Sequence, residues 1–123
     1  MKNYVRHIAL DSRGGIIFSE PEAQRVSIYN DRGNLLRQIE PLERSAYAFV
    51  YPSGVAVDRS DNLYVCDTVQ HRVIKFDQVG LPLGEVLNDS EHGLCFPHDV
   101  AVSNNWKIIC SFADGRTADV YSC

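Results

Sequence analysis

The sequence predicts an all-β fold in which a four-stranded sheet repeats along the chain, as in the blades of a β-propeller. One pattern of apolar runs and polar turns occurs three times: Ile8, Val55 and Val100 mark equivalent positions, separated by steps of 47 and 45 residues. A period of roughly 40–50 residues is typical of propeller blades, whereas helical repeats recur about every 34 residues. The apolar runs are also too short for stable helices, which favours brief and frequent strands.

Each copy begins with two strands joined by a tight hairpin. The first strand is a short apolar run, at residues 8–10, 55–57 and 100–102. A polar turn follows it, at residues 11–15, 58–62 and 103–106. The second strand is again apolar, at residues 16–18, 63–66 and 108–110. The turns are rich in Gly, Asn and Asp, residue types that tolerate the positive φ angles of tight hairpins.

A third strand alternates apolar and polar residues, which predicts one buried and one wetter face. It lies at residues 26–29, 73–76 and 118–121. In the first two copies Gly33 and Gly80 precede a fourth, weaker strand, at residues 35–39 and 83–87. We therefore expect blades at about 4–43, 47–90 and 93–123, the last one lacking its outer strand.

Composition excludes some classes of protein. Hydrophobic residues make up 45% of the chain and charged residues 23%, as in ordinary globular proteins. No run of about 18 apolar residues occurs, so the sequence predicts no membrane span. The net charge of −4 does not favour a protein whose affinity comes from neutralising phosphates.

The cysteines show no metal-binding spacing. They are Cys66, Cys95, Cys110 and Cys123, and none belongs to a C-x-x-C pair. We expect reduced thiols, with Cys66 and Cys110 acting as small buried hydrophobic residues within strands.

The second copy resembles an NHL repeat. YPSGVAVD begins at residue 51, NLYVCD at 62 and HRVIKFD at 71, and together they follow that family's pattern closely. The first copy is looser, with Val5 replacing the proline and Glu20 standing where Asp67 does. In the third copy Thr117 replaces the arginine. The resemblance implies an NHL-type propeller, of the kind found in TRIM-like proteins.

NHL propellers usually close with about six blades, so three blades make half a ring. Half a ring exposes strand edges and apolar sheet faces. Three explanations stay open. The chain is an excerpt of a longer protein that supplies further blades, a second copy supplies them, or the chain is a damaged or engineered fragment.

The segments that enter the first strands are the main candidate site. In a propeller they lie near the central channel, and the matching residues are Arg6, His7, Ser53, Gly54, His98 and Asp99. They form either the rim of a binding site or a set of polar turn residues beside a solvated axis. The loop before the third strand adds His71 and Arg72, since loops on a rigid scaffold commonly carry recognition.

His98 also suggests an enzyme. The segment FPHDVAV at residues 96–102 is similar to the one that carries a zinc-binding histidine in peptidyl-hydroxyglycine lyase propellers. A zinc site needs three or four converging ligands. Because Arg6 and Ser53 stand at the matching positions, we predict no metal from this chain, and zinc or calcium only under this enzyme alternative.

Two repeated charged positions have a structural interpretation. Arg25 and Arg72 precede the third strand of their blades, and Glu20 and Asp67 precede the loop that leads to them. The arginines suit a phosphate or carboxylate partner, but repetition favours a bond to a backbone carbonyl or an acid of the neighbouring blade. The acids are best explained as loop caps.

We therefore expect a non-enzymatic scaffold in a larger protein, binding a protein partner through its loops and channel face. An RNA-binding face is one alternative, although the arginines are scattered and no aromatic cluster accompanies them. A metal-dependent propeller enzyme is the other. We expect no membrane partner and a cytoplasmic location, or an extracellular one under the lyase alternative. Fold alone does not decide between these functions.

Overall fold

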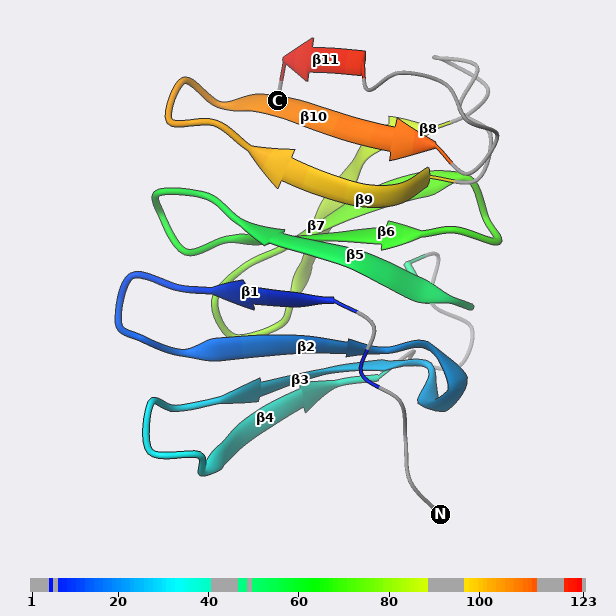
Figure 1. The fold of residues 1–123 in the computed structure, drawn as a ribbon. Coiled ribbons are helices and arrows are strands. Elements are labelled where there is room, and N and C mark those ends of the chain that lie inside the picture. Colours follow the sequence, from blue (N-terminus) through cyan, green and yellow to red (C-terminus); the bar gives the residue numbers. More distant parts are fainter. Residues whose placement is uncertain are drawn as a thin grey trace.

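The computed structural model describes residues 5, 7–40, 47–48, 50–88, 97–112 and 119–122. Within them the chain forms three antiparallel sheets that stack in sequence order (Figure 1). The first sheet has the order β1-β2-β3-β4, the second β5-β6-β7-β8, and the third β9-β10-β11. Each sheet lies within one of the segments expected from the repeat, and we number the blades accordingly.

The strands of blade 1 are β1 (Ile8–Leu10), β2 (Ile16–Glu20), β3 (Arg25–Tyr29) and β4 (Leu35–Ile39). Those of blade 2 are β5 (Pro52–Val57), β6 (Leu63–Asp67), β7 (Arg72–Phe76) and β8 (Pro82–Asn88). Those of blade 3 are β9 (Pro97–Val102), β10 (Lys107–Phe112) and β11 (Asp119–Ser122). A short 3₁₀ turn, η1 (Pro21–Ala23), lies between β2 and β3. Among the described residues, no helix is long and apolar enough to cross a membrane.

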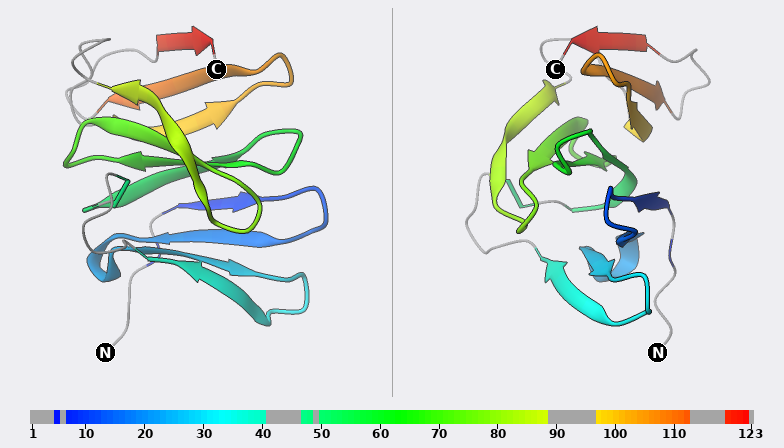
Figure 2. Two further views of the ribbon diagram at one scale, coloured as in Figure 1. Left: turned by 180° about the vertical axis from the view of Figure 1, so that it is seen from behind. Right: turned by 90° about the vertical axis from the view of Figure 1, so that its left-hand side faces the viewer.

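The first strands of the blades are neighbours. Strand β5 contacts both β1 and β9, whereas β4 and β8 lie on the opposite side, so the sheets fan out from the inner strands (Figure 2). The apolar runs at 55–57 and 100–102 thus belong to inner strands of adjacent sheets. The predicted all-β, propeller-type architecture is confirmed.

The hairpin turns share one hydrogen-bond pattern. In each, a side-chain oxygen accepts the backbone N–H groups two and four residues further on; the accepting residues are Asp11, Asn30, Asp58, Asp77 and Ser103. The fourth residue of each turn has a positive φ, between 64° and 91°. Gly occupies that position in three turns, and Asp61 and Trp106 occupy it in the other two with the same positive φ conformation. Local sequence therefore sets the register of each hairpin.

Two apolar clusters hold the blades together. Ile17, Val26 and Ile28 of blade 1 pack against Val55, Leu63, Val65 and Ile74 of blade 2. On the other face of blade 2, Tyr64, Cys66 and Val73 pack against Val100, Ile108 and Cys110 of blade 3. Blade 2 is consequently buried on both faces, as the unbroken burial of β6 records.

Cys66 and Cys110 are free, fully buried thiols in the second cluster. The pKa of the Cys66 thiol lies well above its ordinary value. Burial is the main cause, and the hydrogen bond and the charge interaction with Cys110 act in the same direction. Their expected role as small core residues is confirmed. Cys95 and Cys123 lie outside the described residues.

Gly54 allows the inner strands of blades 2 and 3 to approach closely. A Cβ atom at this position would lie 2.5 Å from the Cα atom of Asp99 and 2.9 Å from the nitrogen of Val100. Both are backbone atoms, so no side-chain rotation can relieve the clash. The glycine is needed here for space, since its φ is not positive.

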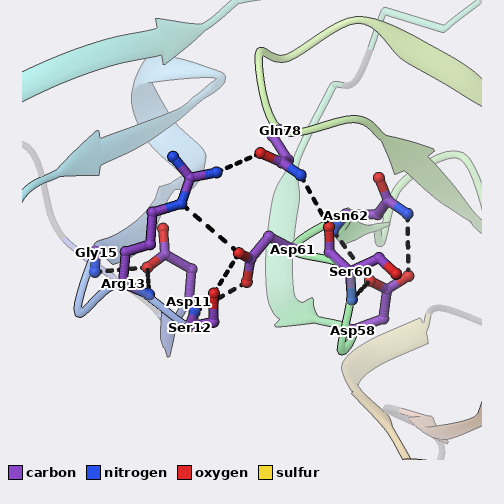
Figure 3. A network of polar contacts seen from close by, with 9 residues as sticks. All are labelled: Asp11, Ser12, Arg13, Gly15, Asp58, Ser60, Asp61, Asn62 and Gln78. Carbon is purple, nitrogen blue, oxygen red and sulfur yellow. Dashed lines mark hydrogen bonds and ion pairs between the residues drawn. The ribbon is translucent and has the colours of Figure 1, made fainter.

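A polar network joins blades 1 and 2 at the turn ends of their sheets (Figure 3). The Asp61 carboxylate accepts hydrogen bonds from the side chain and the backbone N–H of Ser12. Arg13 lies 3.9 Å from Asp61 and donates to Gln78, which in turn donates to the Ser60 carbonyl. The Ser12 side chain, then its backbone N–H, and finally the charge of Arg13 lower the pKa of Asp61 below its ordinary value of 3.8.

Replacing Gly54 should loosen the contact between blades 2 and 3. We expect Gly54→Ala to lower the free energy of unfolding by about 1–3 kcal/mol, the usual cost of overpacking. Gly33→Asn is the control, because a Cβ at Gly33 meets no atom within 4 Å and Asn tolerates its φ of +84°. Urea denaturation measures both. Equal stability of Gly54→Ala and the parent protein would contradict the close approach.

The Asp61 network should depend on pH. Because the folded-state pKa is lowered, its stabilisation is complete above the ordinary carboxyl pKa and is lost as the pH falls through the folded-state value. We expect Asp61→Asn to cost about 1 kcal/mol at neutral pH, with the difference vanishing in acid. Thermal melts across the pH range measure it, with Asp31→Asn as control, since the exposed Asp31 side chain bonds to no other described residue. A difference that is constant with pH would refute the role of the charge.

Candidate functional site

The ends of the sheets opposite the tight turns carry the candidate site. There strands β1, β5 and β9 begin, and there the loops between the second and third strands of blades 1 and 2 lie (Figure 1). We call this end of the sheets the loop face and define it by six residues, of which Ser53 is buried beneath the others: His7, Val50, Ser53, Val69, His98 and Asp99. Four of them were predicted from the sequence. The predicted Arg6 lies outside the described residues.

Residues of blades 1 and 3 meet across blade 2. The His7 and His98 rings are arranged edge to face, with centroids 5.9 Å apart. Nε2 of His7 lies 3.8 Å from Oδ2 of Asp99. The Asp99 side chain is 54% exposed and that of His7 is 22% exposed. The repeat thus brings His7 beside His98 and Asp99, two predicted residues that lie more than 90 positions further along the chain.

The two histidines keep unused hydrogen-bonding capacity. Nδ1 of His7 and Nδ1 of His98 are buried and have no hydrogen-bond partner among the described residues. By contrast, the backbone of His7 is fixed, because its N–H donates to Ser19 Oγ and its carbonyl accepts the Ser19 N–H. The scaffold therefore holds the backbone of His7, while one ring nitrogen of each histidine stays unpaired among the described residues.

Ser53 has a structural partner. It is fully buried, and its Oγ lies 2.6 Å from Oγ1 of Thr68, which donates at 2.7 Å to the carbonyl of Pro97. This chain of bonds ties the inner strand of blade 2 through its loop to the start of blade 3. Thr68 was not expected from the sequence, because a single threonine in a polar loop gives no sign of an inter-blade contact.

Two exposed valines add apolar surface to the loop face. Val50 is 38% exposed and Val69 is 50% exposed. Their segments are adjacent, because the Thr68 N–H donates to the Tyr51 carbonyl and the Val50 N–H donates to Asp67. Sequence reasoning missed them. The signal available was a lone apolar residue within the otherwise polar loop at 67–72.

Asp67 was expected to cap the loop that follows it, but its carboxylate instead holds the segment that leads into β5. It is fully buried, and its two oxygens accept the backbone N–H groups of Val50 and Tyr51 at 2.9 and 3.1 Å. Arg72 lies beside it and is 8% exposed. Its guanidinium donates to Glu85 at 2.6 Å and to the Ala48 carbonyl at 2.8 Å. A backbone carbonyl and an acid were the expected partners, but Glu85 belongs to β8 of the same blade.

In blade 1, by contrast, the equivalent acid and arginine are bonded to each other. Arg25 donates to Glu20 at 3.1 Å, and Ser27 donates to the other oxygen of that carboxylate. Burial raises the pKa of Glu20, but the hydrogen bonds from Arg25 and Ser27 outweigh it and the net shift is downward. The pKa of Arg25 is raised, chiefly by its bond to Glu20. The guanidinium groups of Arg25 and Arg72 are therefore bonded to partners within their own blades.

His71, also expected in the binding surface, is the last residue of the loop before β7. Its φ is +55°, and its N–H donates to the Thr68 carbonyl at 3.4 Å. Gln24 occupies the equivalent place in blade 1, with a φ of +54°. The position is thus a turn position that recurs between blades.

The arrangement does not make a complete metal centre. Two imidazoles and one carboxylate lie close together, but no group of three His, Cys, Asp or Glu side chains within the described ranges has the geometry to hold an ion. The residues present do not fit the zinc or calcium of the enzyme alternative without ligands from elsewhere.

Comparisons with known proteins agree with the architecture. The family model described as NHL repeat matches residues 49–76, the loop-face entry to blade 2 and its strands β5 to β7. A lactonase, drp35 of Staphylococcus aureus, is 38% identical over 64 residues, which are 49% of this chain and 20% of that protein.

Solved structures of low identity share the fold over nearly the whole chain. Hydrazine synthase of Kuenenia stuttgartiensis matches with a TM-score of 0.76 and 18% identity, over 96% of this chain and 32% of the other. A chain of a nidogen–laminin complex matches with a TM-score of 0.70 and 15% identity, over 96% and 48%. This chain thus spans a third to a half of the length of these structures and a fifth of the lactonase. It contains an NHL repeat in its second blade and is built as a partial β-propeller.

Proposed function

We propose that this chain is a non-enzymatic interaction module that binds a protein partner through the loop face. The observation that carries the proposal is the mixture of groups on that surface. Exposed apolar side chains at Val50 and Val69 lie in one loop cluster that is joined through Thr68 to the start of blade 3. There Asp99 is exposed and His98 retains an unpaired ring nitrogen. Apolar contacts surrounded by polar groups are typical of protein interfaces.

The charges of the loop face support a protein partner over RNA. Among the described residues, Arg25 and Arg72 flank this surface, and they already bond to Glu20 and to Glu85 with the Ala48 carbonyl. Asp99 adds an exposed negative charge. An RNA-binding surface needs free cations to neutralise phosphates and aromatic side chains on which bases stack. We therefore propose RNA binding only as the alternative that the experiment below would reveal.

The rigid setting of the loop face also supports recognition. Asp67 fixes the segment at Val50, Thr68 fixes the start of β9, and Ser19 fixes the backbone of His7. Ordering such groups before binding reduces the entropy that association costs. We propose that the partner contacts both blades 2 and 3, and that further blades, when present, extend the same surface.

A metal-dependent enzyme is the second candidate. It is favoured by the paired His7 and His98, whose Nδ1 atoms are buried and unpaired among the described residues, and by the matched lactonase. Metal analysis of the purified full-length protein distinguishes the two functions. The interaction module contains no stoichiometric zinc or calcium. A bound ion that is lost in His98→Ala would replace our proposal with the enzyme.

Substitution of the exposed valine tests the interaction surface. A partner is first identified by cross-linking to the full-length protein, then purified and titrated against variants. We expect Val69→Asp to weaken binding about tenfold or more, because it places a charge in the apolar part of the interface. Leu81→Asp is the matched control, since Leu81 is 61% exposed in the turn at the far end of blade 2.

Two outcomes would contradict the proposal. Binding that is equally weakened by both variants, or by neither, would move the interface away from the loop face. A ligand that proves to be RNA, with an affinity that falls steeply as salt is raised, would establish the nucleic-acid alternative instead.

A further inference from the structure

A cleft opens between blades 1 and 2 near their tight turns, away from the loop face. Its volume is about 290 Å³. The apolar part of its lining includes Ile17 and Ile28 from blade 1 and Leu63 from blade 2. Leu36 and Val79 also line it and are 53% and 59% exposed. The cleft therefore offers a small apolar surface between two rigid sheets, a setting typical of small-molecule sites.

Most polar side chains of this cleft have partners within the protein. Oδ1 of Asp11 accepts the backbone N–H groups of Arg13 and Gly15 at 2.9 and 2.7 Å. Asp61 accepts from Ser12, and Gln78 bonds to Arg13 and to the Ser60 carbonyl (Figure 3). These groups form the polar rim and stabilise the contact between the blades. Their bonds leave them less available to a ligand.

Arg37 differs from the rest of the lining. It lies on β4 directly opposite Ile28 of β3, so both side chains extend from the face of blade 1 that faces blade 2. Its Nε atom is buried without a hydrogen-bond partner. No hydrogen bond or ion pair joins its side chain to any other described residue. A guanidinium that is partly buried without an acceptor is unfavourable, and an anionic ligand would correct this.

We propose that this cleft binds a small amphipathic monocarboxylate, with its carboxylate on Arg37 and its apolar part against Ile17, Ile28 and Leu63. A guanidinium binds a carboxylate through two parallel hydrogen bonds, which fixes the orientation of the ligand. A single negative charge suits the site because Asp11 and Asp61 also line it and would repel a second one. The site lies at the opposite end of the sheets from the loop face and does not depend on the function proposed there.

Titration of the full chain with octanoate and with octanamide tests the assignment. The two probes share an apolar chain but differ in charge at the head group. We expect octanoate to bind the parent protein about tenfold more tightly than octanamide, as a charge-assisted bond requires. Arg37→Gln should remove that preference. Arg32→Gln is the matched control, because Arg32 is exposed in the turn between β3 and β4 and does not line the cleft.

A second variant keeps the test decisive if Arg37→Gln perturbs folding, which circular dichroism and a thermal melt reveal. Leu36→Asp places a negative charge at the cleft and should weaken octanoate about tenfold while leaving octanamide nearly unchanged. The proposal is overturned if octanoate shows no saturable binding, if both probes bind the parent equally, or if Arg37→Gln keeps the preference for the carboxylate.

Discussion

Each sheet of this chain carries apolar side chains on both faces, and each face needs a neighbouring sheet to remove it from water. Blade 2 meets this condition on both sides, with Val55 and Tyr64 at 5% and 0% exposure. Blade 1 meets it on one side. Ile8 and Leu10, which match Val55 and Val57 in the repeat, are 61% and 66% exposed. Burial of such side chains contributes on the order of 1.5–3 kcal/mol each, so the mutual covering of blades dominates the stability of the fold.

Some features of the fold depend on short segments of sequence, and others depend on packing between neighbouring blades. Strand positions and tight turns could be predicted because they depend on short segments: Asp11, Asp58 and Ser103 each cap a turn formed by the next few residues. The structure extends β5 and β9 backwards to Pro52 and Pro97, beyond the apolar runs at 55–57 and 100–102. The residues that follow these prolines, Ser53 and Gly54 in β5 and His98 and Asp99 in β9, show no alternation of apolar and polar types, so they gave no strand signal.

Contacts between blades explain what the sequence did not reveal about the site. Equivalence within the repeat was enough to bring His7, His98 and Asp99 to one end of the sheets. It could not indicate that His7 approaches Asp99, or that Thr68 bonds to Pro97, because both depend on the angle between adjacent sheets. The cleft at Arg37 has the same origin, since its walls come from two blades. The two ends of the sheets thus differ in character: two histidines with unpaired ring nitrogens lie at one, and a capped polar rim borders an apolar cleft at the other.

The uniform turn caps have a consequence for how such a chain changes over evolutionary time. The five-residue turn of each hairpin sets the register of the two strands that it joins. Strand pairing within a blade therefore depends on the sequence of that blade and not on its position in the chain. Duplication or loss of a whole repeat unit by recombination therefore preserves correct pairing inside every remaining unit. Only the surfaces between units must then adapt, and at the junction of the second and third units that adaptation includes the absence of a side chain at Gly54.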